Sequence, residues 1–160
     1  MGTAAAFLKR LQSVDITELT GQIIAENPNA IADINRKQML QGKDNKGQPL
    51  PPIIGDPWFK KPGADYRYAA FKQKLFPETP FGISNFIVIG VYHNSLSVLR
   101  TGPIVRFDAS ASFAGAIAQK TNNSTLGLNA DSQSLAWKTV IKIPLVHRIA
   151  PMLGCKISNS

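Results

Sequence analysis

Apolar residues recur at the spacing of a helix through the first quarter of the chain, with polar residues between them. In residues 3–13 the apolar positions repeat every three to four residues, as they do on one side of a helix. These positions are Ala4, Phe7, Leu8 and Leu11. The pattern therefore predicts a short amphipathic helix over residues 3–13.

Two further helices are predicted before residue 42. Asp15 and Glu18 have the spacing of an N-terminal capping box, and an apolar stripe follows them. Asn27 is the expected cap of the next helix, with Pro28 in its first turn, where a missing N–H costs nothing. That helix is predicted to end at Gly42, because glycine favours the conformation that stops a helix.

The segment from Gly42 to Gly63 changes character completely. It reads GKDNKGQPLPPIIGDPWFKKPG, and its four glycines and five prolines disfavour both helix and central strand. Loops of this length are uncommon in compact domains and are usually functional or ordered by a partner. We therefore expect an extended loop that contacts a partner, followed by a helix over 64–76 that Pro77 ends.

β-Branched and aromatic residues dominate the next part of the chain. Phe81 to Tyr92 reads FGISNFIVIGVY and predicts a strand, with a turn at residues 93–95. Shorter strands are expected at Leu96–Arg100 and Ile104–Phe107, joined by a turn at residues 101–103. Together these strands predict a small antiparallel sheet.

The last third is predicted to be helical again. Ala109–Lys120 suits a helix, a polar loop follows, and a final helix begins near Asp131. Pro144 should kink or break that helix, and Pro151 should end it.

The predicted class is α+β, with N-terminal helices, a long Pro/Gly-rich loop, a small antiparallel sheet and a C-terminal helix. A chain of 160 residues has the length of one domain. We expect a single domain over 1–160, with a helical part at 1–42, an extended loop at 43–63 and an α+β core at 64–160.

Composition adds two expectations about partners and location. The net charge of +8 favours association with polyanions, and a charged fraction of only 18% suggests that partners cover part of the surface. A lone cysteine, Cys155, forms neither an internal disulfide nor a zinc site. No secretory signal and no apolar run of membrane-spanning length are present, so we expect a soluble protein made in the cytoplasm.

Catalytic chemistry finds little support in the sequence. His93 and His147 lack a partner at metal-ligand spacing, and Asp44 in KDNKG suits a tight turn better than a calcium loop. We expect no enzyme activity, no cofactor and no metal. The alternative of a small enzyme or enzyme inhibitor has four candidate groups, namely Asp44, Asp65, His93 and His147.

Aromatic and basic residues interleave after the loop's prolines. They are Trp58, Phe59, Lys60, Lys61, Tyr66, Arg67, Tyr68, Phe71, Lys72 and Lys74. Such a surface can stack bases and neutralise phosphates. The favoured interpretation is that the aromatic side chains anchor the loop and helix to the core while the basic side chains stay solvated. A DNA-facing surface with Lys60, Lys61, Arg67, Lys72 and Lys74 remains the alternative.

Two stretches resemble a family of phage proteins. INRKQMLQGKDNKGQPLPP, residues 34–52, is similar to small virion proteins of phages and prophages of Bacteroidetes-type bacteria. The matching positions are Asn35, Gln38, Gly42, Asp44 and Gly47. STLGLNADSQSLAWKTVIKIPLVHRI, residues 124–149, resembles the closing segment of tail-completion and virion-morphogenesis proteins of Mu-like phages. The positions that carry this second match are Leu126, Gly127, Leu128 and Asp131.

The resemblance implies a structural subunit of a tail-completion or head-tail connector ring, located in the tail or neck of the virion. Its expected partners are further copies of itself, the portal, connector or tail-tube proteins, and passing DNA, with no membrane. We expect the loop and its flanks to make the subunit contacts. The candidate residues are Asn35, Gln38, Gly42, Asp44, Gly47, Trp58 and Phe59. A basic DNA-binding virion module that uses Trp58 to Lys74 is the alternative function.

Overall fold

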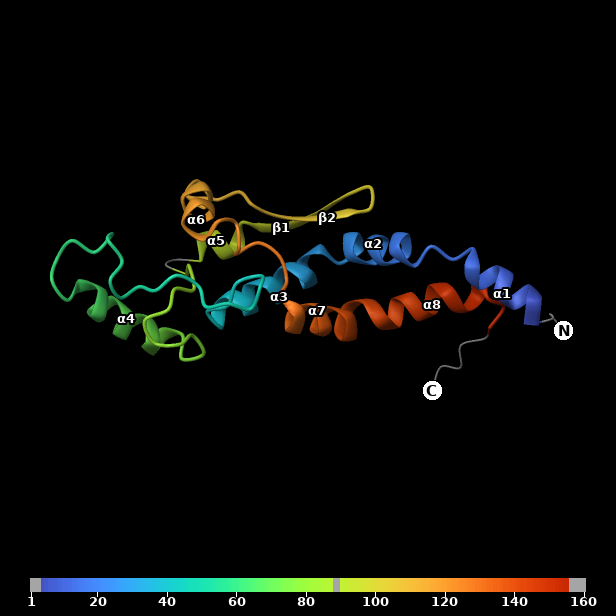
Figure 1. Ribbon diagram of the computed structural model, residues 1–160, viewed down its shortest axis with the longest axis horizontal. Coiled ribbons are helices and arrows are strands. Elements are labelled where there is room, and N and C mark those ends of the chain that lie inside the picture. Colours follow the sequence, from blue (N-terminus) through green and yellow to red (C-terminus); the bar gives the residue numbers. More distant parts are fainter. Residues whose placement is uncertain (1–3, 88–89, 156–160) are drawn as a thin grey trace.

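The protein is elongated, and its chain runs from one end of the long axis to the other and back. A computed structural model describes residues 4–87 and 90–155. Helix α1 (Ala4–Gln12) lies at one end, and helix α4 (Ala64–Leu75) lies at the other with the proline-rich loop (Figure 1). The middle contains α3 (Pro28–Leu40), which packs against the hairpin, the start of the C-terminal helical rod and the preceding helix.

The predicted N-terminal helices are confirmed: α1 is followed by α2 (Ile16–Glu26) and α3. The Asp15 carboxylate caps α2 by accepting the Glu18 backbone N–H at 2.9 Å. The second half of the predicted capping box is not made. The Glu18 carboxylate instead accepts hydrogen bonds from Gln22 and Arg100, which ties α2 to the sheet.

The junction between α2 and α3 differs from the prediction at one residue. Asn27 does not cap α3 with its side chain, because its Nδ2 donates to the Ile23 carbonyl at 2.8 Å and so ends α2. The predicted C-terminus of α3 is confirmed. Gly42 adopts a φ of +69°, its N–H donates to Met39, and the Lys43 N–H donates to Gln38. This pairing satisfies the last carbonyls of the helix.

The predicted hairpin is confirmed as an antiparallel pair. Strand β1 (Leu96–Thr101) pairs with β2 (Ile104–Ala109), with Leu96 opposite Ala109 at one end of the register. Alternate residues of β1, Leu96 and Val98, are buried, whereas Leu99 faces outward. One face of the hairpin therefore contributes to the core.

The predicted strand over Phe81–Tyr92 is wrong for the residues that the structure describes; positions 88–89 lie outside them. The segment joins the loop through single contacts, such as the Ile53 N–H to the Gly82 carbonyl and the Ser84 N–H to the Pro51 carbonyl. The expected turn after it is a short helix, α5 (Val91–Asn94). A high strand propensity produced no strand here because the partner backbone is an irregular proline-rich loop without free N–H groups at its prolines.

The C-terminal third is largely helical, as predicted, but its first helix begins at Ala114 and not at Ala109, because β2 extends through Ala109. After α6 (Ala114–Thr121), a continuous helical rod comprises α7 (Ala130–Ala136), a π-helical turn (Trp137–Ile141) and α8 (Lys142–Met152). Pro144 lacks the N–H that would bond four residues back, and the irregular turn lies just before it. The rod is thus irregular just before Pro144, where a kink or break was predicted, but it is not broken there. Pro151 lies inside α8, which ends one residue later at Met152.

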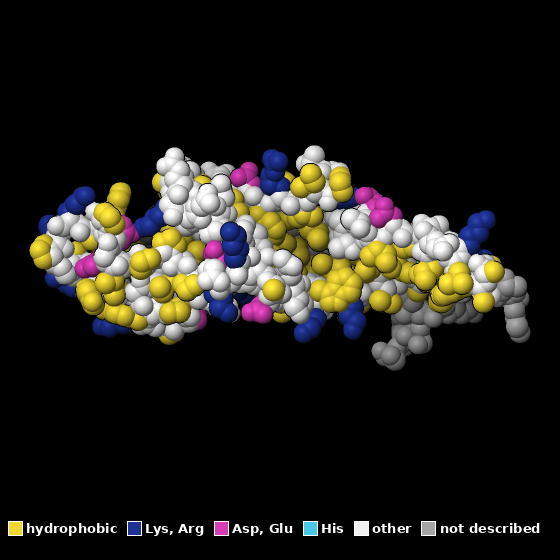
Figure 2. Space-filling model, viewed as in Figure 1, with side chains coloured by type: hydrophobic (Ala, Val, Ile, Leu, Met, Phe, Trp, Pro, Cys, Tyr) yellow, Lys and Arg dark blue, Asp and Glu magenta, His cyan; other side chains and the backbone are white. Residues whose placement is uncertain are grey.

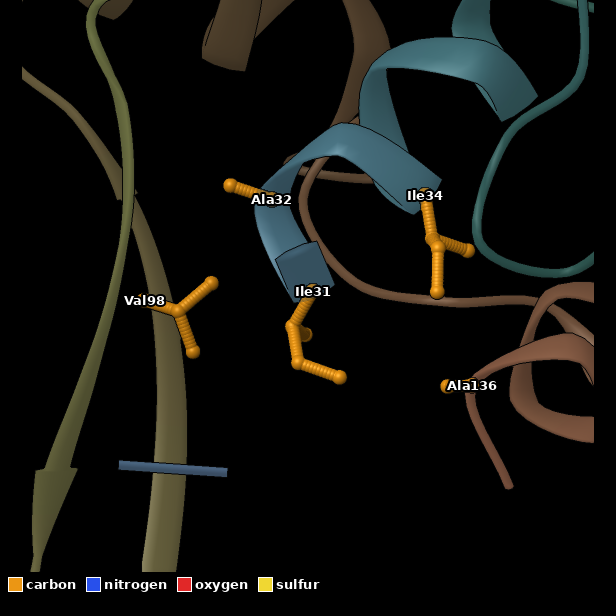
Figure 3. Close-up of a cluster of buried hydrophobic side chains, with 5 residues drawn as sticks. All are labelled: Ile31, Ala32, Ile34, Val98 and Ala136. Atoms are coloured by element: carbon orange, nitrogen blue, oxygen red, sulfur yellow. The ribbon is translucent and has the colours of Figure 1, made fainter. Parts of the chain in front are cut away.

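The largest contribution of α3 to the core is a small apolar cluster. Figure 3 shows side chains of α3 directed toward Val98 of β1 on one side and Ala136 of α7 on the other. The cluster consists of Ile31, Ala32, Ile34, Val98 and Ala136. A second cluster lies around Met39, and a third joins α2 to α8. The α+β class with a C-terminal helix is confirmed.

Candidate functional site

The two stretches that carry the family resemblance pack against each other. The Asn35 side chain donates to the carbonyls of Thr125 and Gly127 at 3.1 and 3.0 Å. Gln38, one turn later on α3, donates to Gly127 at 3.0 Å and accepts the Asn129 N–H at 2.8 Å. Because both side chains are fully buried, they act within the subunit.

The first half of the loop is a tight turn, as predicted for KDNKG. The buried Asp44 carboxylate accepts the N–H groups of Lys46 and Gln48 at 2.9 and 2.7 Å. Asn45 binds the segment that contains Leu126. Asp44 therefore shapes the turn, and of the five motif residues only Gly47 is exposed.

The second half of the loop forms one wall of an apolar cavity of about 790 Å³. Helix α4, residues 84–87 and α6 supply the other walls. The lining residues are Ile53, Asp56, Pro57, Trp58, Phe59, Tyr68, Lys72, Ser84, Phe86, Ile87, Phe113, Ile117 and Lys120. This volume falls within the range of about 300–1,000 Å³ that is usual for ligand pockets.

Two carboxylates hold the loop in place around this cavity. Asp65 accepts the N–H groups of Gly55 and Tyr66, both at 2.9 Å, and these hydrogen bonds keep the pKa of Asp65 below its usual value. Asp56 forms an ion pair with Lys120 of α6. Burial acts to raise the pKa of Asp56, but the hydrogen bonds from Lys120 and the Trp58 N–H outweigh burial and lower it.

The aromatic residues of this region fall into two groups. Phe59 and Tyr68 pack together with their ring centres 5.4 Å apart, so the expectation that aromatic side chains anchor the loop is confirmed for this pair. Trp58 is 83% exposed at the cavity wall, and Tyr66 and Phe71 are also exposed. Exposed aromatic side chains of this size are typical of contact surfaces.

The basic residues of this region also fall into an exposed group and a buried one. Lys60, Lys61, Arg67 and Lys74 are exposed, as a DNA-facing role requires. Lys72 is only 6% exposed, so its predicted place on that surface is wrong. Its ammonium group donates to the Ile87 carbonyl and lies 4.6 Å from the centre of the Phe76 ring.

Burial lowers the pKa of Lys72 from 10.5 to about 8. At a pH between these two pKa values, Lys72 is protonated in the unfolded chain and deprotonated in the folded chain. The free energy of unfolding should therefore rise with pH in this range. We expect the wild type to gain about 1–3 kcal/mol of unfolding free energy relative to Lys72→Met between pH 8 and 10. Urea titrations across this range measure the difference. The exposed Lys74→Met control should track the wild type, and parallel curves for all three proteins would contradict the assignment.

The four groups considered for catalysis are dispersed. His93 is buried and donates from Nε2 to the Asn85 carbonyl at 2.8 Å, and its burial lowers its pKa. His147 is exposed on α8. Within residues 4–87 and 90–155 no hydrogen bond or ion pair joins any two of Asp44, Asp65, His93 and His147, and no cluster of metal-ligating side chains occurs.

A second exposed apolar surface lies at the opposite end of the molecule. No residue of α1 is buried, and Phe7, Leu8 and Leu11 are all more than 40% exposed. Figure 2 shows hydrophobic side chains in a band over α8 and α1. None of the described helices is long and apolar enough to cross a bilayer.

The sequence does not reveal this pairing of an apolar cavity with a distant apolar helix, because the cavity walls come from four separate segments. Asn35 and Gln38 are expected from the sequence to contact a partner, but both are buried within the subunit. One sequence pattern does indicate their burial. The two residues share a single helix face with the apolar residues Ile31 and Ile34. No family model, curated protein or solved structure matches the chain.

Proposed function

We propose that this protein is a structural subunit of a phage tail-completion or head-tail connector ring. The observation that carries the proposal is the number of large apolar side chains left in water along an elongated body, including those on α1 at one end and those on the loop and α4 at the other. Monomeric soluble proteins rarely expose large contiguous apolar patches, and such patches mark contact surfaces. A subunit that meets a neighbour at each end accounts for both patches.

The surface area supports this proposal. The chain of 17.4 kDa exposes 10,339 Å². A compact monomer of that mass exposes about 7,900 Å². The excess of about 2,500 Å² exceeds the roughly 1,600 Å² that a subunit loses when it forms two interfaces of standard size, each removing about 800 Å² from it.

The place of the ring in the virion rests on the family resemblance of residues 34–52 and 124–149. In the structure these two stretches form one hydrogen-bonded unit through Gln38 and Asn129. That unit holds α3, the loop and the start of the helical rod together, as we expect of two stretches that form the shared core of one family. The partners proposed on this basis are the portal, connector or tail-tube proteins.

Native mass spectrometry combined with negative-stain imaging of the full chain tests the proposal. The expected result is one dominant closed oligomer that appears as a ring in projection. A persistent monomer at every concentration and salt condition would contradict it. An open filament would support self-association but would contradict a closed ring.

A second candidate function is supported by the exposed basic groups near the cavity. Lys60, Lys61, Arg67 and Lys74 lie on the loop and α4, whose exposed aromatic residues can stack with bases. If all four neutralise duplex phosphates, log affinity should fall with log salt with a slope of about −3 to −4. Filter binding measures this slope, and absence of binding at low salt would exclude the role.

A further inference from the structure

Helix α1 has the composition of an element that needs a partner. It is nine residues long, and isolated helices of fewer than about 12–15 residues are marginal in water. Phe7, Leu8 and Leu11 lie on one side, whereas Lys9 lies on the opposite side. None of these apolar side chains is buried within the subunit.

The cavity at the other end offers a receiving surface of matching chemistry. Its walls are dominated by apolar and aromatic side chains, among them Phe59, Phe86 and Phe113. Trp58 stands exposed beside it, with the size and shape of an interface anchor. The ion pair between Asp56 and Lys120 offsets two of the charges that line the cavity, and the ammonium group of Lys72 is held by the Ile87 carbonyl.

We infer that the apolar side of α1 docks into the cavity of a second copy of this chain. This inference rests on the proposed ring function and names the two surfaces that would close the ring. Helix α1 and the cavity lie at opposite ends of the molecule, so the contact joins different patches on neighbouring subunits (Figure 1). Contacts of this head-to-tail type generate closed rings when the rotation between subunits closes.

A second copy is the occupant that the structure favours over an unrelated partner. One repeated contact covers both apolar surfaces of every subunit in a closed ring. The excess exposed area of about 2,500 Å² is sufficient for two standard interfaces per subunit. A single unrelated partner would leave one of the two surfaces in water.

Charge gives the contact a distinct salt dependence. The chain carries a net charge of +8, and Lys60, Lys61 and Arg67 lie near the cavity while Lys9 and Arg10 lie on α1. Salt screens repulsion between such like-charged surfaces. Moderate salt should therefore tighten self-association, whereas it weakens binding to nucleic acid.

Two variants of the full chain test the docking. The helix variant carries Leu8→Asp and Leu11→Asp, and its control carries Leu99→Asp and Ile104→Asp on the hairpin. Leu8 and Leu99 are matched, since they are 55% and 53% exposed, so both substitutions should leave the fold intact. The cavity variant carries Trp58→Asp, and its control carries Tyr66→Asp, an exposed position that does not line the cavity.

Sedimentation velocity should show at least about 30-fold weaker self-association for the helix variant and for the cavity variant. Both controls should stay within about threefold of the wild type. An equimolar mixture of the two variants should form a 1:1 heterodimer, because one retains the cavity and the other retains the helix. That heterodimer should not grow further.

Other outcomes overturn the inference in separable ways. A wild-type oligomer that both variants leave unchanged overturns the docking and leaves the ring intact. A cavity variant that still dimerises shows that α1 pairs with another α1. A mixture that stays monomeric shows that the two surfaces are not complementary. A monomeric wild type overturns the ring function itself, along with the docking that rests on it.

Discussion

Replacement of Gln38 by alanine should lower the free energy of unfolding by about 3–5 kcal/mol. The side chain is buried and satisfies two backbone groups, the Gly127 carbonyl and the Asn129 N–H. Its loss leaves the Asn129 N–H without a partner, at a cost of about 1–3 kcal/mol, and opens a void in the core. The Gly127 carbonyl loses one of its two donors but still accepts from Asn35. Chemical denaturation monitored by far-UV circular dichroism measures the change.

Lys37→Ala is the matched control for this prediction. Lys37 is the adjacent residue on α3 and is exposed, so its loss should change stability by less than about 0.5 kcal/mol. If Gln38→Ala lowered the free energy of unfolding as little as the control does, the hydrogen bonds from α3 to residues 127–129 would not hold the two stretches together. The assignment of the motif to internal packing would then fail.

Replacement of Ile31 by alanine should cost about 2–5 kcal/mol, the usual range for buried Ile to Ala changes. Ile31 is 2% exposed in the cluster of Figure 3, between the hairpin and the helical rod. Ile31 also lines a small apolar hollow of about 230 Å³, so its truncation enlarges a space that is already incompletely filled. Thermal and urea denaturation should both show this decrease in the free energy of unfolding.

Ile104→Ala provides the comparison at an exposed position of the same residue type. Ile104 lies at the start of β2 and is largely exposed, so its truncation should cost less than about 1 kcal/mol. Equal losses at the two sites would contradict a core centred on α3. They would indicate that the hairpin tip is covered in solution.

Local features of the sequence predicted much of the fold. Asp15 and Gly42 determine helix ends through hydrogen bonds to residues close in the chain, so their roles are readable from spacing. The hairpin was predictable for the same reason, because a Gly102 turn separates two short alternating segments. The long loop followed directly from its prolines and glycines.

The features that were not predictable depend on segments far apart in the chain. Phe81–Tyr92 has the composition of a strand, but strand formation requires a partner strand, and its described residues meet the loop backbone instead. The burial of Lys72 depends on how α4 packs against residues 84–87. Helix α4 is only weakly amphipathic, so periodicity does not reveal which face is covered.

The residues predicted to contact a partner fall into two groups in the structure. The sequence pointed to the loop and the segment from Trp58 to Lys74, and the structure places Trp58 and Phe59 on the wall of one cavity. Asn35, Gln38 and Asp44, assigned to the same contact, are buried within the subunit. Buried polar residues of the motif therefore serve internal packing, while the exposed aromatic residues remain the candidates for contact.

Sedimentation velocity of the wild-type chain over a series of concentrations, at low and at moderate salt, tests most directly whether copies of this chain close into a ring. We expect a single closed oligomer that becomes more populated as the protein and salt concentrations increase, since screening reduces repulsion between copies of charge +8. A species that sediments as a monomer throughout the series would contradict it.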